Sequence, residues 1–220
     1  MTKPECVIFD CDGVLIDSEI LTCRAWHETL AELGINMTLK EVMNKIIGRS
    51  EASNQADIEM AYQVAIPQEY IVKKRLLSNK YFENDLKAIP GIVDFIDAVP
   101  MKKCVASGSS PEHLRRALDM VGLSARFAPH IFSAAQVKNG KPAPDLFLFA
   151  AEQMGVAPSA CFVIEDSIVG VRAAKAAAMK VYGFTGGGHC DDEQGDRLLR
   201  EGADAVFDNM KRMTEAFRDL

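Results

Sequence analysis

Short apolar runs followed by segments with helical periodicity constrain the fold of this chain more than any other feature. The runs are nearly continuous, as in strands that are buried on both faces of a parallel sheet. Most of them precede a stretch in which apolar residues recur at helical spacing. This alternation predicts an α/β fold with a doubly wound parallel sheet. The expected strands are Cys6–Phe9, Cys104–Ala106, Ile131–Ser133, Cys161–Ile164, Val181–Phe184 and Ala205–Phe207.

Helix signals between these runs favour the same fold. Ser110 before Pro111 is typical of an N-cap with proline in the first turn, and Gly122 is a suitable end for that helix. The stretch from Asp145 to Met154 is also amphipathic and stops at a glycine.

Residues 18 to about 84 interrupt the alternation, because helical segments follow one another there without a convincing strand. Trp26, Leu30 and Leu33 lie at helical spacing and are expected in the core of this insertion. The expected domains are therefore a Rossmann-like core of residues 1–16 and 86–220 and an inserted all-helical domain of residues 17–85.

Composition argues against some classes of function. The chain has 220 residues, of which 48% are hydrophobic and 25% charged, as expected for a soluble globular protein. A net charge of -6 without a long basic run argues against general nucleic-acid binding. No stretch approaches about 18 consecutive apolar residues, so no membrane partner is expected.

The N-terminus and the cysteines bear on location. The first residues show no charged segment followed by a long apolar one, so we expect no signal peptide. The 6 cysteines are scattered and form no CxxC pair, which is typical of reduced thiols in a cytoplasmic protein. We expect a cytoplasmic monomer or weak homo-oligomer.

Polar residues gather where the expected strands end. In an α/β sheet, ligands bind outside the carboxyl ends of the strands, so residues distant in sequence meet at that edge. Their side chains are chemically coherent: several acids, one lysine, and hydroxyl groups with backbone N–H donors. The residues are Asp10 and Asp12, then Ser107, Gly108 and Ser109, then Lys141, and finally Glu165 and Asp166.

The acids at this edge predict a magnesium site. Two carboxylates as close as Asp10 and Asp12 repel one another and resist desolvation unless a positive charge is present. Mg²⁺ prefers oxygen ligands and commonly takes substrate phosphate and water beside a few protein groups. Asp10, Asp166 and a backbone carbonyl can hold such an ion and draw in a phosphate.

The spacing of the two aspartates predicts that one acts as a nucleophile and the other as a general acid. Residues two apart along a strand return to the same face, so Asp12 lies beside Asp10. One carboxylate can attack phosphorus while the other protonates the leaving oxygen. Lys141 can neutralise charge on the transferring group, and Ser107 can donate a hydrogen bond to it.

The segments "DCDGVLIDS", "VASGS", "KPAPD" and "EDSIVG" resemble, in order and spacing, the motifs of the haloacid dehalogenase (HAD) superfamily. The resemblance covers essentially the whole chain. It is to the phosphatase branch that carries a helical cap after the first motif, near beta-phosphoglucomutase and small sugar-phosphate phosphatases. Dehalogenases of this superfamily lack the second aspartate and need no magnesium, so Asp12 argues against that activity.

The resemblance implies a role for each motif residue. Asp10 becomes the nucleophile that forms an aspartyl-phosphate, and Asp12 the general acid and then base. Ser107 and Lys141 become phosphate binders. The implied metal ligands are Asp10, the main-chain carbonyl of Asp12 and Asp166, with Glu165 as a direct or outer partner. The implied substrate-binding set is Ser107, Gly108, Ser109, Lys141 and Arg49.

Three further features have competing interpretations. "TGGGHCDD", residues 185–192, favours a flexible turn over a metal site or a substrate-side loop. His27 is expected to be structural or exposed. Arg49 follows a glycine between two helices of the insertion, and it is either a surface arginine or a substrate contact.

The sequence as a whole indicates a Mg²⁺-dependent phosphatase acting on a small phosphorylated metabolite, a sugar or polyol phosphate. The first alternative is a phosphosugar mutase, because "RAW" at residues 24–26 resembles the beta-phosphoglucomutase family. In that family a histidine on this helix helps position the general acid, whereas the matching position here is Thr22. The second alternative is a non-catalytic binding protein on the same fold.

Overall fold

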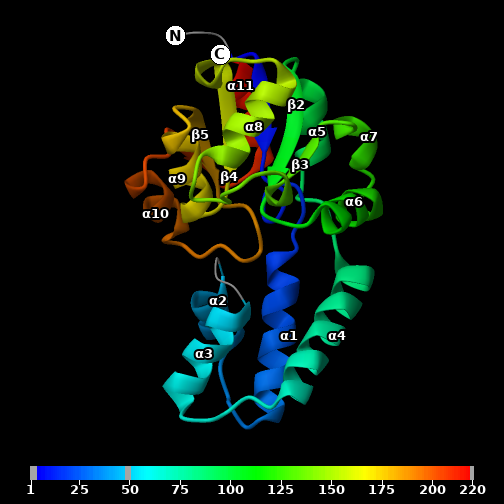
Figure 1. The fold of residues 1–220 in the computed structure, drawn as a ribbon, viewed down its shortest axis with the longest axis vertical. Coiled ribbons are helices and arrows are strands. Elements are labelled where there is room, and N and C mark those ends of the chain that lie inside the picture. The colour runs from blue at the N-terminus through cyan, green and yellow to red at the C-terminus, as the bar shows by residue number, and fades with distance from the viewer. Residues whose placement is uncertain (1–3, 48–50, 219–220) are drawn as a thin grey trace. The chain divides into compact units, whose positions relative to one another are not determined.

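The structure, a computed structural model, describes residues 4–47 and 51–218. The chain divides into two compact units (Figure 1). The core unit consists of Met1–Ile16 and Lys87–Leu220, and the helical unit of Asp17–Leu86. None of the described helices is both long enough and apolar enough to cross a membrane.

The core unit contains a six-stranded parallel sheet with the order β3-β2-β1-β4-β5-β6. The expected strands all form, and three of them are slightly longer than expected. The fold class is thereby confirmed. The strands are β1 (Cys6–Phe9), β2 (Lys102–Ser107), β3 (Ile131–Ser133), β4 (Cys161–Glu165), β5 (Lys180–Phe184) and β6 (Ala205–Phe207).

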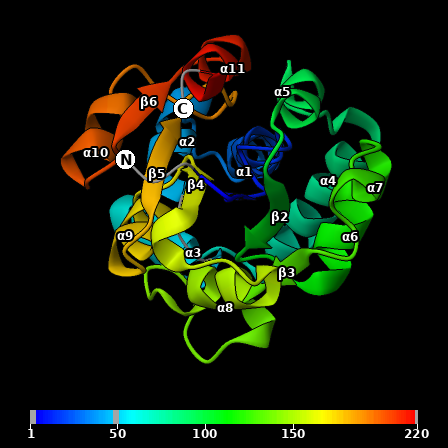
Figure 2. The same ribbon diagram turned by 90° about the horizontal axis from the view of Figure 1, so that it is seen from above.

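Helices cover both faces of this sheet, as the view in Figure 2 shows. On one face, α8 and α9 pack over a cluster that includes Ile8 and Val163. On the other face, Phe9 makes edge-to-face contacts with Phe95 and Phe127, at ring-centroid distances of 5.8 Å and 5.4 Å. The helices of the core unit are α5 (Ile92–Ala98), α6 (Pro111–Met120), α7 (Ser124–Phe127), α8 (Asp145–Met154), α9 (Ile168–Ala176), α10 (Gln194–Arg200) and α11 (Met210–Arg218), with short 3-10 turns at Ala134–Gln136 and Pro158–Ala160.

The strand order places the functional edge of the sheet. The chain moves outward from β1 to β2 and β3, then returns to the other side of β1 with β4. Ligands of doubly wound sheets bind at such a reversal, outside the carboxyl ends of the strands. In this chain β1 leads directly into Asp10, and β4 ends at Glu165.

The helical unit consists of α1 (Glu19–Glu32), α2 (Leu39–Ile46), α3 (Glu51–Tyr62) and α4 (Gln68–Asp85). α2 begins with a capping box, in which Thr38 and Glu41 satisfy each other's backbone N–H groups. Trp26 and Leu30 are buried in the core of this unit and Leu33 packs against them, as expected from their spacing.

Candidate active site

Asp10 and Asp12 follow β1 directly, and their environments differ. Asp10 is buried, and its backbone N–H donates to the carbonyl of Ile164 at 3.0 Å, which continues the ladder between β1 and β4. Asp12 is only partly buried, with a side chain 19% exposed. Gly13 then turns the chain at φ +85°, and a Cβ there would lie 1.9 Å from Asp166 Oδ2. Only glycine allows this close approach.

Lys141 joins the ends of three strands. Its Nζ donates to Asp10 Oδ1 at 2.6 Å, to Glu165 Oε1 at 2.6 Å and to the carbonyl of Ala106 at 3.0 Å. An ammonium has three N–H donors, so these contacts use all of them. Burial alone would lower the pKa of Lys141, but the attraction of Asp10 and Glu165 outweighs it and raises the pKa.

Three buried carboxylates converge beside this lysine. One oxygen from each of Asp10, Glu165 and Asp166 lies within 4.8 Å of the others. Burial raises the pKa of Asp10 well above its ordinary value, and burial also raises that of Asp166. The free energy of keeping these groups charged is therefore unfavourable without a further cation.

This donor set fits a hard divalent ion such as Mg²⁺. All the converging ligand atoms are carboxylate oxygens, which is the chemistry that Mg²⁺ prefers. Both carboxylate oxygens of Glu165 already accept hydrogen bonds. Its Oε1 accepts from Lys141, while its Oε2 accepts from the backbone N–H and the hydroxyl of Ser167 at 3.0 Å and 2.9 Å. Asp10 and Asp166 are therefore the carboxylates better placed to bind a metal directly.

Hydroxyl groups at the end of β2 and just after it contact Asp12. Ser109 Oγ donates to Asp12 Oδ2 at 2.8 Å, and Ser107 Oγ lies 3.5 Å from the same oxygen. The backbone N–H of Ser109 donates to Ser107 Oγ at 3.1 Å, which fixes the turn through the exposed Gly108. His113 Nε2 lies 3.8 Å from Asp12 Oδ1. Sequence reasoning missed His113, which the first turn of α6 brings to this edge.

The segment after β5 brings a histidine to the acids. Residues 185–192 include a turn, as the sequence favours, and within it His189 is 5% exposed with its Nε2 2.8 Å from Asp166 Oδ2. Burial opposes the charged imidazole, yet the hydrogen bond to Asp166 raises the pKa of His189 to about 11. No spacing signal in the sequence marks this contact, because it depends on how the loop folds back.

Three candidates of the helical unit remain. Arg49 lies outside the described residues. His27 and Thr22 are both half-buried on α1 in the helical unit.

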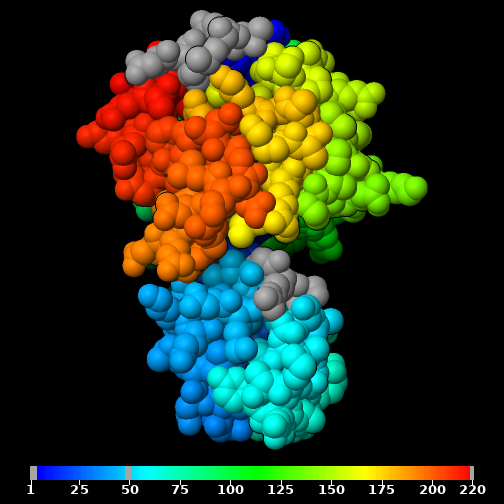
Figure 3. All heavy atoms as spheres, turned by 90° about the vertical axis from the view of Figure 1, so that its left-hand side faces the viewer, coloured from blue at the N-terminus to red at the C-terminus, as the bar shows by residue number. Residues whose placement is uncertain are grey.

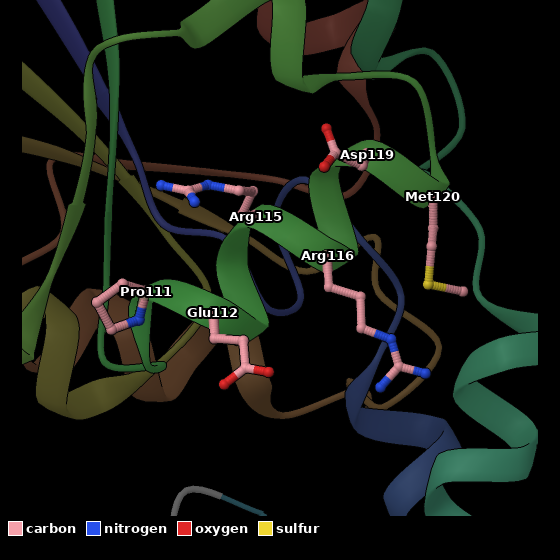
Figure 4. Close-up of a pocket in the computed structure, with 6 residues that line it drawn as sticks. All are labelled: Pro111, Glu112, Arg115, Arg116, Asp119 and Met120. Carbon is pink, nitrogen blue, oxygen red and sulfur yellow. The ribbon is translucent and has the colours of Figure 1, made fainter.

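A pocket of about 510 Å³ lies along the exposed face of α6 (Figure 4). Its lining includes none of the converging acids, and the guanidinium groups of Arg115 and Arg116 point away from each other. We therefore place the chemistry at the strand ends and not in this pocket.

Comparisons with known proteins show what the whole chain is similar to. A family model described as haloacid dehalogenase-like hydrolase matches residues 4–178. The chain is 28% identical over 192 residues to a 6-phosphogluconate phosphatase of Escherichia coli, covering 86% of each protein. It is 32% identical over 208 residues to a phosphorylated carbohydrates phosphatase of Thermotoga maritima, covering 92% of this chain and 93% of that one. A HAD family hydrolase of Deinococcus radiodurans, solved with bound phosphate and sodium, has a TM-score of 0.91 and 29% identity, over 100% of this chain and 97% of that chain.

Proposed function

The chain belongs to the haloacid dehalogenase-like hydrolase family, and on that premise we propose that it is a Mg²⁺-dependent phosphatase of a small sugar or polyol phosphate. The observation that carries the proposal is the buried cluster of Asp10, Glu165 and Asp166 around Lys141, at the reversal of the sheet. Two relatives bear the names of phosphatases of 6-phosphogluconate and of phosphorylated carbohydrates, which supports this substrate class.

Asp10 and Asp166, with the main-chain carbonyl of Asp12, are the groups that we assign to Mg²⁺. When bound, this ion supplies positive charge that offsets the carboxylates and orients a phosphate. Lys141 donates to both Glu165 and Asp10, so Glu165 helps to keep the ammonium beside the nucleophile. Ser107 and Ser109 offer hydroxyl and backbone donors to the phosphoryl oxygens.

Two chemical steps follow from these positions. A carboxylate oxygen of Asp10 attacks phosphorus, the ester P–O bond breaks, and Asp12 gives its proton to the leaving alkoxide. Asp12, now a carboxylate, takes a proton from water as that water attacks the aspartyl-phosphate. The bond between Asp10 and phosphorus then breaks, which restores Asp10 and releases inorganic phosphate. In this proposal the helical unit is the cap that excludes water from the first step.

The surroundings of Asp12 favour hydrolysis over the mutase alternative. Ser109 holds its carboxylate at 2.8 Å, and both residues belong to the core unit. Thr22, at the position where the mutase family carries histidine, cannot supply a positive charge. In this proposal the contact with Ser109 orients Asp12, which then activates water.

The test is purified protein with Mg²⁺ against a panel of phosphorylated sugars, polyols and sugar acids, with phosphate release as the readout. We expect turnover that chelator abolishes and Mg²⁺ restores, with Ca²⁺ a poor substitute because its coordination is looser. Undiminished activity in excess chelator would reject the metal assignment. A hexose 1-phosphate with a trace of the bisphosphate tests the alternative, since hexose 6-phosphate appearing faster than phosphate indicates a mutase.

The 6 cysteines are all free, which fits the reducing cytoplasm that we propose as the location.

A further inference from the structure

The segment that follows β5 donates two hydrogen bonds to Asp166. His189 Nε2 donates to the side chain at Oδ2, at 2.8 Å, and Gln194 Nε2 donates to the main-chain carbonyl of Asp166 at 2.6 Å. Both donors lie between β5 and the first residue of α10. In the space-filling view this part of the chain, drawn in orange, packs closely on the outside of the core unit (Figure 3).

Two glycines make room for the imidazole. A Cβ at Gly13 would lie 2.7 Å from His189 Cε1, and a Cβ at Gly187 would lie 2.7 Å from both Cε1 and Nδ1. These two glycines come from loops that are distant in sequence, one after β1 and one after β5. The ring is thus held in a slot between two backbones, with its side chain only 2% exposed.

The remaining ring nitrogen does not explain this burial. Nδ1 of His189 is buried and has no hydrogen-bond partner among the described residues. An unpaired buried polar atom has a cost in stability. Nε2 contacts Asp166 Oδ2 at 2.8 Å and Cys190 Sγ at 3.4 Å, and the carboxylate contact is the shorter of the two.

We propose that His189 is a positioning residue that holds Asp166 Oδ2, so that the other oxygen of this carboxylate is presented to Mg²⁺. Gln194 holds the main chain of Asp166 through its hydrogen bond to the carbonyl. The inference rests on the proposed function, because it assumes that Asp166 is a metal ligand. Groups that orient the ligands of a metal commonly change its affinity by about 10- to 100-fold when they are removed.

The experiment is calorimetric titration of the full-length protein with MgCl₂, without substrate. His189→Ala should weaken Mg²⁺ binding by at least about 10-fold. His189→Gln should recover most of that loss, because its amide nitrogen can reach the same oxygen. His27→Ala, a histidine of the helical unit, is the matched control and should leave the affinity unchanged. Gly187→Ala, which pushes on the ring without removing it, should weaken binding in the same direction.

The outcomes separate the two proposals. If wild-type protein binds Mg²⁺ and His189→Ala binds it equally or more tightly, the positioning role is wrong and the proposed function stands. A glutamine variant no better than alanine also overturns that role. If wild-type protein shows no Mg²⁺ binding at all, the metal assignment fails and this inference fails with it. A purely structural role would lower the melting temperature of the variants without changing their Mg²⁺ affinity.

Discussion

The two units each bury a lysine against an aromatic ring, and the two lysines differ in what surrounds them. The side chain of Lys141 in the core unit is 8% exposed and its Nζ lies 4.9 Å from the centre of the Phe147 ring. The side chain of Lys74 in the helical unit is 7% exposed and its Nζ lies 5.2 Å from the centre of the Trp26 ring. Burial and aromatic contact are therefore matched.

The difference lies in the balance of charge. Lys141 stands beside three buried carboxylates, whereas Lys74 shares the single carboxylate of Glu51 with Arg75. The pKa values of the acids in the two sites move in opposite directions. Burial raises the pKa of Asp10, whereas at Glu51 the hydrogen bonds of Arg75 and Lys74 overcome the effect of burial and lower the pKa. A buried lysine without an excess of carboxylates around it needs no further cation, whereas an excess of buried carboxylates requires one.

The largest effect is expected at Asp10, which belongs to the cluster with an excess of carboxylates. Asp10→Asn is nearly isosteric, but an amide is a far poorer nucleophile and metal ligand. We expect turnover to disappear while circular dichroism shows the fold intact. Residual activity within about tenfold of the wild type would reject Asp10 as the nucleophile. Lys74→Met is the matched control from the Glu51 site, which has no excess of carboxylates, and it should retain phosphatase activity.

Asp12→Asn should lower activity by about 10²- to 10⁴-fold on alkyl phosphates, which need a proton on the leaving oxygen. On an aryl phosphate the leaving group is stable without that proton, so the loss of the first step should be much smaller. The comparison is made by kcat/KM for a sugar phosphate and for an aryl phosphate. Equal losses on both would argue against a general acid at Asp12.

The next effect concerns stability and contrasts the two lysines directly. Lys141→Met leaves Asp10 and Glu165 buried without their partner, which should cost about 3–5 kcal/mol of unfolding free energy. Lys74→Met should cost less, about 1 kcal/mol, because Glu51 keeps Arg75 and is partly exposed. Saturating Mg²⁺ should restore much of the first loss and none of the second. Urea unfolding with and without Mg²⁺ measures both, and equal responses to Mg²⁺ would contradict the distinction.

The sequence predicted the residues at the strand ends but not the contacts of His189 and Lys74. The sheet followed from continuous apolar runs, and the edge with Asp10, Lys141 and Asp166 followed from the rule that strand ends meet. These signals are local and repeat along the chain. The contacts of His189 depend on a loop that folds back across the sheet, which no periodicity records. Lys74 was missed for a similar reason, since its partner lies on another helix and its own helix is mostly polar.

The smallest effect is the pH dependence of the pairing of Glu51 with Lys74 and Arg75. The pKa of Glu51 is lowered in the folded protein relative to an unfolded value of about 4.3. Its contribution to stability is therefore complete above that unfolded pKa, and it is lost as pH falls through the folded pKa.

Removing this carboxylate with Glu51→Gln should cost up to about 1 kcal/mol at pH 7, because the pair is partly exposed. The difference from wild type should shrink towards zero as the pH falls below 4. Urea unfolding of both proteins between pH 7 and pH 3 measures it, with Glu69→Gln at an exposed position of the same unit as the control for losing one charge. A difference that stays constant across this range would show that Glu51 acts by packing, so that charge balance does not distinguish the two lysines.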